Sequence, residues 1–223
     1  MQGTGNPSPT KIIYTSINFL LQHILKNERT DKMKLPKITY NSPVILTFTL
    51  LSFAAVIVGM LTGGASTTLL FSAYRSSLAD PLFYIRLFTH VLGHADMSHF
   101  MGNFTVILLV GPMLEEKYGG KRLLIMIAFT AFITGLINVI FFPHVALLGA
   151  SGTAFMMILL SSFANSKSGE IPLTLIFVAV LYLGTEIING IFADDNISQM
   201  AHIIGGGCGC VFGWAIGKSR AAE

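Results

Sequence analysis

The sequence predicts an all-α integral membrane protein, a bundle of six transmembrane helices. Hydrophobic residues make up 52% of the 223 residues, and charged residues make up only 11%, against roughly 25% in a typical soluble domain. Two long stretches, 38–74 and 123–166, contain no Lys, Arg, Asp or Glu. Because a membrane-spanning helix needs about 20 apolar residues, both stretches are long enough to cross a bilayer.

The chain begins with a polar segment, 1–41, that holds six basic residues. Apolar residues recur at helical spacing from Ile13 to Ile24, which favours a short amphipathic helix on the membrane surface. A poorly ordered tail is the alternative. The apolar run is interrupted by polar residues and has no small-residue cleavage site, so it does not resemble a secretory signal.

A six-span domain, 42–218, follows and leaves a short tail, 219–223. We place the spans at about 43–62, 97–115, 122–142, 148–166, 171–192 and 198–217. The longest connection, 63–96, is rich in aromatic residues, which suits a segment lying at the level of the lipid headgroups.

The basic residues set the predicted orientation. Twelve of the fourteen Lys and Arg residues fall on one side of the predicted membrane, and only Arg75 and Arg86 fall on the other. The positive-inside rule therefore places both termini in the cytoplasm. We expect an integral protein of a bacterial plasma (inner) membrane. The net charge of +3 does not indicate a nucleic-acid partner.

Ser151 lies between Gly149 and Gly152 at the start of the fourth span. A nucleophilic serine needs a bare backbone around it, so that a carbonyl group can approach and a backbone N–H can face the developing oxyanion. The start of a helix supplies such N–H groups. Alternatively, the small residues only allow two helices to pack closely, and the serine caps one of them.

His202 stands beside a stripe of small residues in the sixth span. The stripe repeats every four residues and consists of Ala201, Gly205, Gly209, Gly213 and Gly217. Small residues let helices approach closely, and the glycines around Ser151 are the natural partner surface. His202 would then come within hydrogen-bond reach of Ser151, as an activated nucleophile requires. We see no acidic residue placed to orient the imidazole, which predicts a dyad and not a triad.

His99 and Asn103 are four residues apart, so they share one face of the second span. In a catalytic interpretation they supply donors to an oxyanion hole, together with the Ser151 N–H. In the alternative they form a polar contact between helices worth about 1 kcal/mol. Because the second, fourth and sixth spans all run inward, all four polar residues should lie at a similar depth, in a cavity open to the outside.

Several motifs resemble those of the rhomboid intramembrane serine proteases. The three strongest are Gly149-Ala150-Ser151-Gly152, Ala201-His202-x-x-Gly205-x-x-x-Gly209 and His94-x-x-x-x-His99-x-x-x-Asn103. Arg86 with Phe88-Thr89-His90, and Leu114-Glu115-Glu116-Lys117-Tyr118-Gly119, resemble that family's first loop and the turn after its second span. The resemblance extends from about Val44 to Gly217, with the motifs in the family's order.

The resemblance implies a six-helix fold and a serine–histidine dyad that cleaves single-span membrane proteins near the outer end of their helices. Ser151 would be the nucleophile and His202 the general base, with His99, Asn103 and the Ser151 N–H around the oxyanion. No cofactor or metal is implied, and the oligomeric state stays open. The chain departs from the family at Ile85, where Trp is common. It departs also at Phe155, often Tyr, which keeps a ring that can stack on His202 but loses the hydroxyl. Near the end of the second span, Gly111-Pro112 replaces the usual glycine pairs, and the proline can bend that helix.

Other features of the sequence suggest three alternative functions. His90, His94 and His99 suggest a membrane metalloprotease, but the Glu of the H-E-x-x-H motif is missing. A non-catalytic rhomboid-like protein that binds membrane helices would usually lack the serine or the histidine. A transporter is disfavoured because we see no internal repeat. Cys208 and Cys210 are interpreted as apolar fillers, and Glu186 as a residue near the outer end of the fifth span.

Overall fold

The computed structural model describes residues 16–23, 39–164, 170–183 and 197–221. The chain divides into two units, Met1–Thr39 and Tyr40–Glu223. In the first unit, residues 16–23 are helical and exposed, within the range where the sequence favours an amphipathic helix. Its position at a membrane surface stays a prediction.

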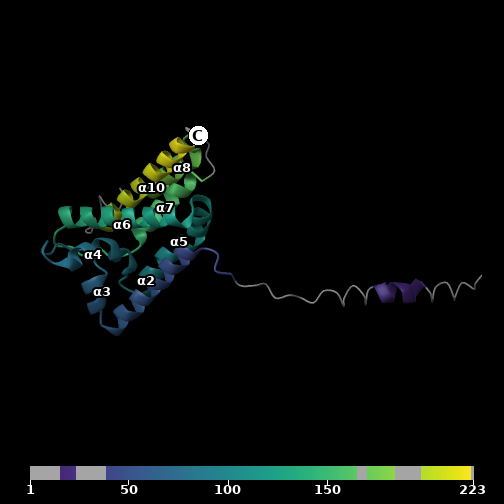
Figure 1. Ribbon diagram of the computed structural model, residues 1–223, viewed down its shortest axis with the longest axis horizontal. Helices are drawn as coiled ribbons and strands as arrows, with labels where there is room; N and C mark the ends of the chain where they lie inside the picture. The colour runs from purple at the N-terminus through teal and green to yellow at the C-terminus, as the bar shows by residue number, and fades with distance from the viewer. Residues whose placement is uncertain (1–15, 24–38, 165–169, 184–196, 222–223) are drawn as a thin grey trace, which may run out of the picture. The chain divides into compact units, whose positions relative to one another are not determined.

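The described part of the second unit is helical apart from its connections, as the sequence predicts (Figure 1). Its elements are α2 (Pro43–Leu61), α3 (Ala65–Leu70), α4 (Pro81–Thr89), η1 (His90–Leu92), α5 (Met97–Tyr118), α6 (Gly120–Phe141), α7 (Ser151–Ser162), α8 (Leu173–Val178), η2 (Ala179–Leu183) and α10 (Ile197–Ala221). Among the described residues, α2, α5 and α6 are long and apolar enough to cross a membrane. Large apolar side chains point outward from them, with Leu61 82% and Leu109 80% exposed, which suits a surface in contact with lipid.

The fourth and fifth spans differ from the expected ranges. α7 begins at Ser151 and has only 12 residues, because the chain before it is extended and pairs with Ala73. Gly149 has a φ of +120°, outside the helical region, so the helix cannot extend back to residue 148. The expected fifth span corresponds to α8 and the π-helical turn η2, and its remainder, with Glu186, lies outside the described residues.

The connection between α2 and α5 is organised around Arg86, which is only 2% exposed. Its Nη2 donates to Asp80 Oδ2 at 2.8 Å and to Ser76 Oγ at 2.7 Å, and its guanidinium lies 4.3 Å from the centre of the Tyr74 ring. Asp80 also caps α4 by accepting from the Leu82 N–H at 2.9 Å. This N–H, followed by Arg86, holds the pKa of the Asp80 carboxyl below its ordinary value of 3.8.

Glu115, near the end of α5, caps the start of α2. Its two carboxylate oxygens accept hydrogen bonds from the Val44 and Ile45 N–H groups, each at 3.0 Å. The first N–H groups of a helix have no partner within it, and a negative charge there interacts favourably with the helix dipole. Glu115 therefore fixes the start of α2 against the end of α5.

Replacing Glu115 with alanine is expected to lower the free energy of unfolding by about 2 kcal/mol, because two charge-assisted cap bonds are lost. Thermal unfolding in detergent measures the change. Glu116→Ala is the matched control, because Glu116 is the next residue of the same helix and is exposed. Equal destabilisation by both variants would show that the hydrogen bonds from Val44 and Ile45 to Glu115 add nothing to the free energy of unfolding.

α7 and α10 pack against each other more extensively than any other described pair of helices (Figure 1). The glycines of α10 make this possible. A Cβ atom built on Gly205 would lie 2.0 Å from the Gly152 carbonyl oxygen, and one on Gly209 would lie 2.3 Å from the Met156 carbonyl oxygen. The small-residue stripe therefore contacts α7, as the sequence predicts, and Cys208 lies in the core beside it.

Candidate active site

The chain that leads into Ser151 is held by backbone hydrogen bonds from the connection after α2. Ala73 and Leu147 exchange two of them, at 2.8 and 2.9 Å. Further along, the Gly149 N–H donates to the His90 carbonyl oxygen at 3.0 Å. Asn138 of α6 links the two segments, since its Nδ2 donates to the carbonyl oxygens of Ala73 and Val145, each at 3.0 Å. Ser151 is thus the first helical residue after a segment with a fixed course.

His94 forms the last of these supports, and sequence analysis gave it no role of its own. Its Nδ1 lies 3.2 Å from the Leu92 carbonyl oxygen, and its Nε2 accepts from the Ala150 N–H at 3.3 Å. These bonds require a neutral ring with the proton on Nδ1. Burial lowers the pKa of His94 to about 4, and the nearby His99 adds to the effect. His94 is therefore neutral at pH 7 and holds the residue before Ser151.

His99 and Asn103 lie beneath Gly149. A Cβ atom on Gly149 would lie 2.8 Å from the His99 ring and 3.6 Å from Asn103 Nδ2. Together with the positive φ, this leaves glycine as the residue that fits. Asp96 caps α5 by accepting from the His99 N–H at 2.8 Å, which fixes the first turn of the helix that carries both side chains.

Asn103 Nδ2 is a buried donor without a hydrogen-bond partner among the described residues, although Asn103 is only 9% exposed. Leaving such a group unpaired costs roughly 1–3 kcal/mol, so an unpaired donor calls for an explanation. This donor lies next to Gly149, which is two residues before Ser151 in the extended chain. Its position suits a group that donates a hydrogen bond only when another molecule is bound.

His202 of α10 stacks on Phe155 of α7, with ring centres 4.3 Å apart and ring planes 5° from parallel. This is the stacking expected from the sequence. Phe155 follows Ser151 by one helical turn, so both residues lie on one face of α7, and aromatic side chains in helices lean toward the N-terminus. The stack therefore places the imidazole on the serine-bearing face, near the start of α7.

The structure gathers the four residues singled out in the sequence where α5, α7 and α10 begin. His99 and Asn103 contact the chain before Ser151, and His202 covers the turn after it. The three histidines of the metalloprotease alternative are engaged differently. His90 Nε2 lies 2.9 Å from the Ala131 carbonyl oxygen, and both nitrogens of His94 interact with backbone groups.

The fold and the site define a helical membrane protein with polar residues collected at the starts of three neighbouring helices. Comparison with known families agrees: the Rhomboid domain family matches residues 82–219. The chain belongs to the rhomboid family.

Individual relatives are similar over parts of their length. YdcA of Bacillus subtilis (strain 168) is 30% identical over 132 residues, which cover 54% of this chain and 61% of YdcA. The rhomboid protease GluP of the same organism is 30% identical over 197 residues, 83% of this chain and 37% of GluP. Rhomboid-related protein 1 of Caenorhabditis elegans is 29% identical over 143 residues, 59% of this chain and 39% of that protein. The chain thus spans less than two thirds of each of these relatives.

Proposed function

We propose that this protein is an intramembrane serine endopeptidase that cleaves the transmembrane segments of single-span membrane proteins near the outer face. Ser151 is the nucleophile and His202 the general base. The observation that carries the proposal is the stacking of His202 on Phe155, one turn from Ser151, at the point where Gly205 meets Gly152. Similarity to a protein named rhomboid protease supports the same class of reaction.

In the proposed reaction, Ser151 Oγ attacks the carbonyl carbon of the scissile bond while its proton passes to His202. The resulting oxyanion is bound by the Ser151 N–H, which has no partner within α7, and by the side chains of Asn103 and His99. His202 then gives the proton to the leaving amine. A water molecule, deprotonated by His202, hydrolyses the acyl-enzyme and releases Ser151 for another cycle.

The length of α7 explains how water reaches a serine inside a membrane protein. Twelve residues span about 18 Å, whereas the hydrocarbon core is about 30 Å thick. If the carboxyl end of α7 lies at the inner surface, Ser151 lies well below the outer surface at the bottom of a recess. We place the protein in a bacterial plasma membrane with both termini cytoplasmic, and the helix at 16–23 on the cytoplasmic surface.

The position of the cut tests this proposal. Purified protein in vesicles, given a model single-span substrate, is expected to cut in the outer part of the substrate helix or just outside it. Gly, Pro or polar residues near that position should favour cleavage, because they weaken the helical hydrogen bonds that hide the carbonyl groups. Mass spectrometry of both products locates the cut. Cleavage at the cytoplasmic end would contradict either the orientation or the site.

Asn103→Ala is expected to lower kcat by about a hundredfold to a thousandfold, the usual loss for one oxyanion donor. The melting temperature should hardly change, because Asn103 Nδ2 has no partner to lose among the described residues. Initial rates and thermal unfolding of the same preparation give both values. A large loss of stability with an unchanged rate would make Asn103 a packing residue.

A further inference from the structure

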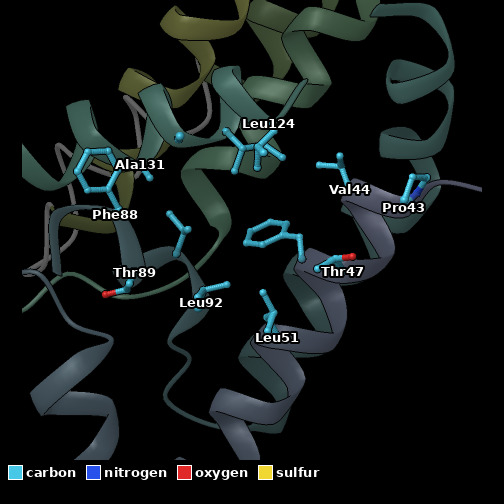
Figure 2. A pocket seen from close by; sticks show the side chains of 13 residues that line it. Pro43, Val44, Thr47, Leu51, Phe88, Thr89, Leu92, Leu124 and Ala131 are labelled. Carbon is cyan, nitrogen blue, oxygen red and sulfur yellow. The ribbon is translucent and has the colours of Figure 1, made fainter. Parts of the chain in front are cut away.

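A groove lies between α2, the α4–η1 segment and α6 (Figure 2). None of the residues that line it belongs to the candidate active site. Its volume is about 530 Å³. Buried side chains form its floor, among them Phe48 and Ile127, and exposed side chains form its rim: Leu51, Phe88 and Leu124. The exposed rim means that the groove opens sideways from the bundle, toward what surrounds the helices.

The lining of the groove suits hydrocarbon. Apart from two threonines, the side chains around it are apolar. The Thr47 hydroxyl lies 2.9 Å from the Tyr40 hydroxyl, and the Thr89 hydroxyl donates to the Ile85 and Leu70 carbonyl oxygens. Both hydroxyls are thus already bonded, so a polar ligand would lose its own hydrogen bonds with water and gain little in return.

The size of the groove matches an acyl chain. A methylene group is about as large as a water molecule, whose share of liquid volume is about 30 Å³. The groove of about 530 Å³ therefore holds about 18 methylene groups, about one fatty acyl chain. Its α2 residues all come from the first nine positions of that helix, 43–51, and its α6 residues lie within the first twelve positions of α6, 120–131. The groove consequently runs from these parts of α2 and α6 toward the α4–η1 segment.

Positive charge marks the end of the groove at the membrane surface. Lys121, Leu124, Ala128 and Ala131 follow one another at helical spacing, and the last three line the groove. Lys121 and its neighbour Arg122 are both exposed. The helix start that carries them also approaches the start of α2, because a Cβ on Gly120 would lie 3.1 Å from Val44. Cations at this level attract anionic headgroups.

We propose that the groove binds one acyl chain of an anionic phospholipid of the cytoplasmic leaflet, with its phosphate near Lys121 and Arg122. The choice of leaflet rests on the orientation proposed above. Occupancy also has a structural consequence, because the groove wall continues into the segment that supports the serine. The His90 carbonyl and the His94 ring, which hold Gly149 and Ala150, directly flank the groove residues of η1.

Photo-crosslinking tests this proposal without reference to protease activity. The full chain is reconstituted in phosphatidylcholine vesicles with a trace of phosphatidylglycerol that carries a diazirine in one acyl chain. After irradiation, crosslinked peptides are expected to concentrate at 43–51, 88–92 and 124–131. Crosslinks spread evenly over the exposed apolar faces of the helices would overturn the proposal. So would preferential labelling of the groove by a photoactivatable transmembrane peptide.

One matched pair of variants tests whether the acyl chain occupies the groove itself. Ala128→Trp fills the groove and is expected to lower crosslinking there about tenfold, the effect of roughly two lost methylene contacts. Ile125→Trp changes an exposed residue of α6 outside the lining and should have no effect. Retained crosslinking in folded Ala128→Trp would contradict the proposal.

The headgroup is tested with the same acyl chains on phosphatidylglycerol and phosphatidylcholine. The double variant Lys121→Gln, Arg122→Gln is expected to remove the preference for phosphatidylglycerol. Arg75→Gln, a change of the same kind at an exposed residue of the connection after α2, should keep it. Equal crosslinking of both lipids by the native chain would contradict the choice of an anionic lipid. The labelling map is expected to be the same in a chain without peptidase activity, so failure here is distinct from failure of the proposed function.

Discussion

Ser151→Ala is expected to lower the cleavage rate of a membrane-spanning substrate by about a millionfold, the scale known for loss of a catalytic serine. His202→Ala should have a similar effect, because without a base the Ser151 hydroxyl is a weak nucleophile at neutral pH. The two residues act as one unit, so the double variant should be no slower than either single variant. Rates are measured with purified protein in vesicles.

Matched controls separate chemistry from structure in this experiment. Ser161 lies on the same helix, and its hydroxyl donates to the Ile158 carbonyl oxygen at 2.7 Å, so Ser161→Ala should keep activity. His144 is exposed in the connection before α7, so His144→Ala should keep activity too. Substantial turnover by Ser151→Ala, or additive losses in the double variant, would show that the two residues do not form a dyad.

Gly205→Val is expected to be the most destabilising single change in α10. The first side-chain atom would lie 2.0 Å from the Gly152 carbonyl oxygen, and backbone cannot move aside as a flexible side chain can. Overpacking typically costs about 1–3 kcal/mol and occasionally more. Activity should fall further than stability does, because moving α10 also moves His202 away from Ser151, and displacement of about 1 Å can cost a hundredfold in rate.

Gly207→Val is the control for the glycine stripe. It makes the same change two residues along the same helix, where a Cβ would have nothing within 4 Å. Any cost from helix propensity is therefore equal in both variants. Thermal unfolding in detergent and matched rate measurements compare them. If Gly205→Val melts and turns over like Gly207→Val, the contact between α10 and α7 does not set the geometry of the site.

The long helices were predictable because their signals are local. The spans expected from apolar stretches at about 43–62, 97–115 and 122–142 agree with α2, α5 and α6 to within a few residues. The start of α7 was not predictable in this way, because Leu147 and Leu148 are as apolar as any residue of a span. Their extended course depends on pairing with Ala73, more than seventy residues earlier. The Glu115 cap of α2 is also a long-range contact, and local patterns do not reveal it.

In the candidate site, too, contacts that leave a local sequence pattern were predictable, and long-range contacts to the backbone were not. The four-residue stripe predicted the contact between α10 and α7, because close packing leaves a signature in composition. The spacing of His99 and Asn103 placed both on one face of α5. The sequence placed His94 in a motif and among the three histidines of the metalloprotease alternative, but did not predict its structural role. Its partners are the backbone groups of Leu92 and Ala150, which have no sequence signature. One general argument points to such a role: a buried histidine ring is energetically unfavourable unless its nitrogens have hydrogen-bond partners.

Labelling with a serine-reactive fluorophosphonate tests the central claim most directly, because it needs no knowledge of the substrate. The native chain in vesicles is expected to be modified at Ser151 and identified by mass spectrometry of the peptide that contains it. Ser151→Ala should not be labelled, and His202→Ala should be labelled far more slowly while remaining folded. A folded native chain that is not modified at Ser151, or labelling that persists in Ser151→Ala, would contradict the assignment of Ser151 as the nucleophile.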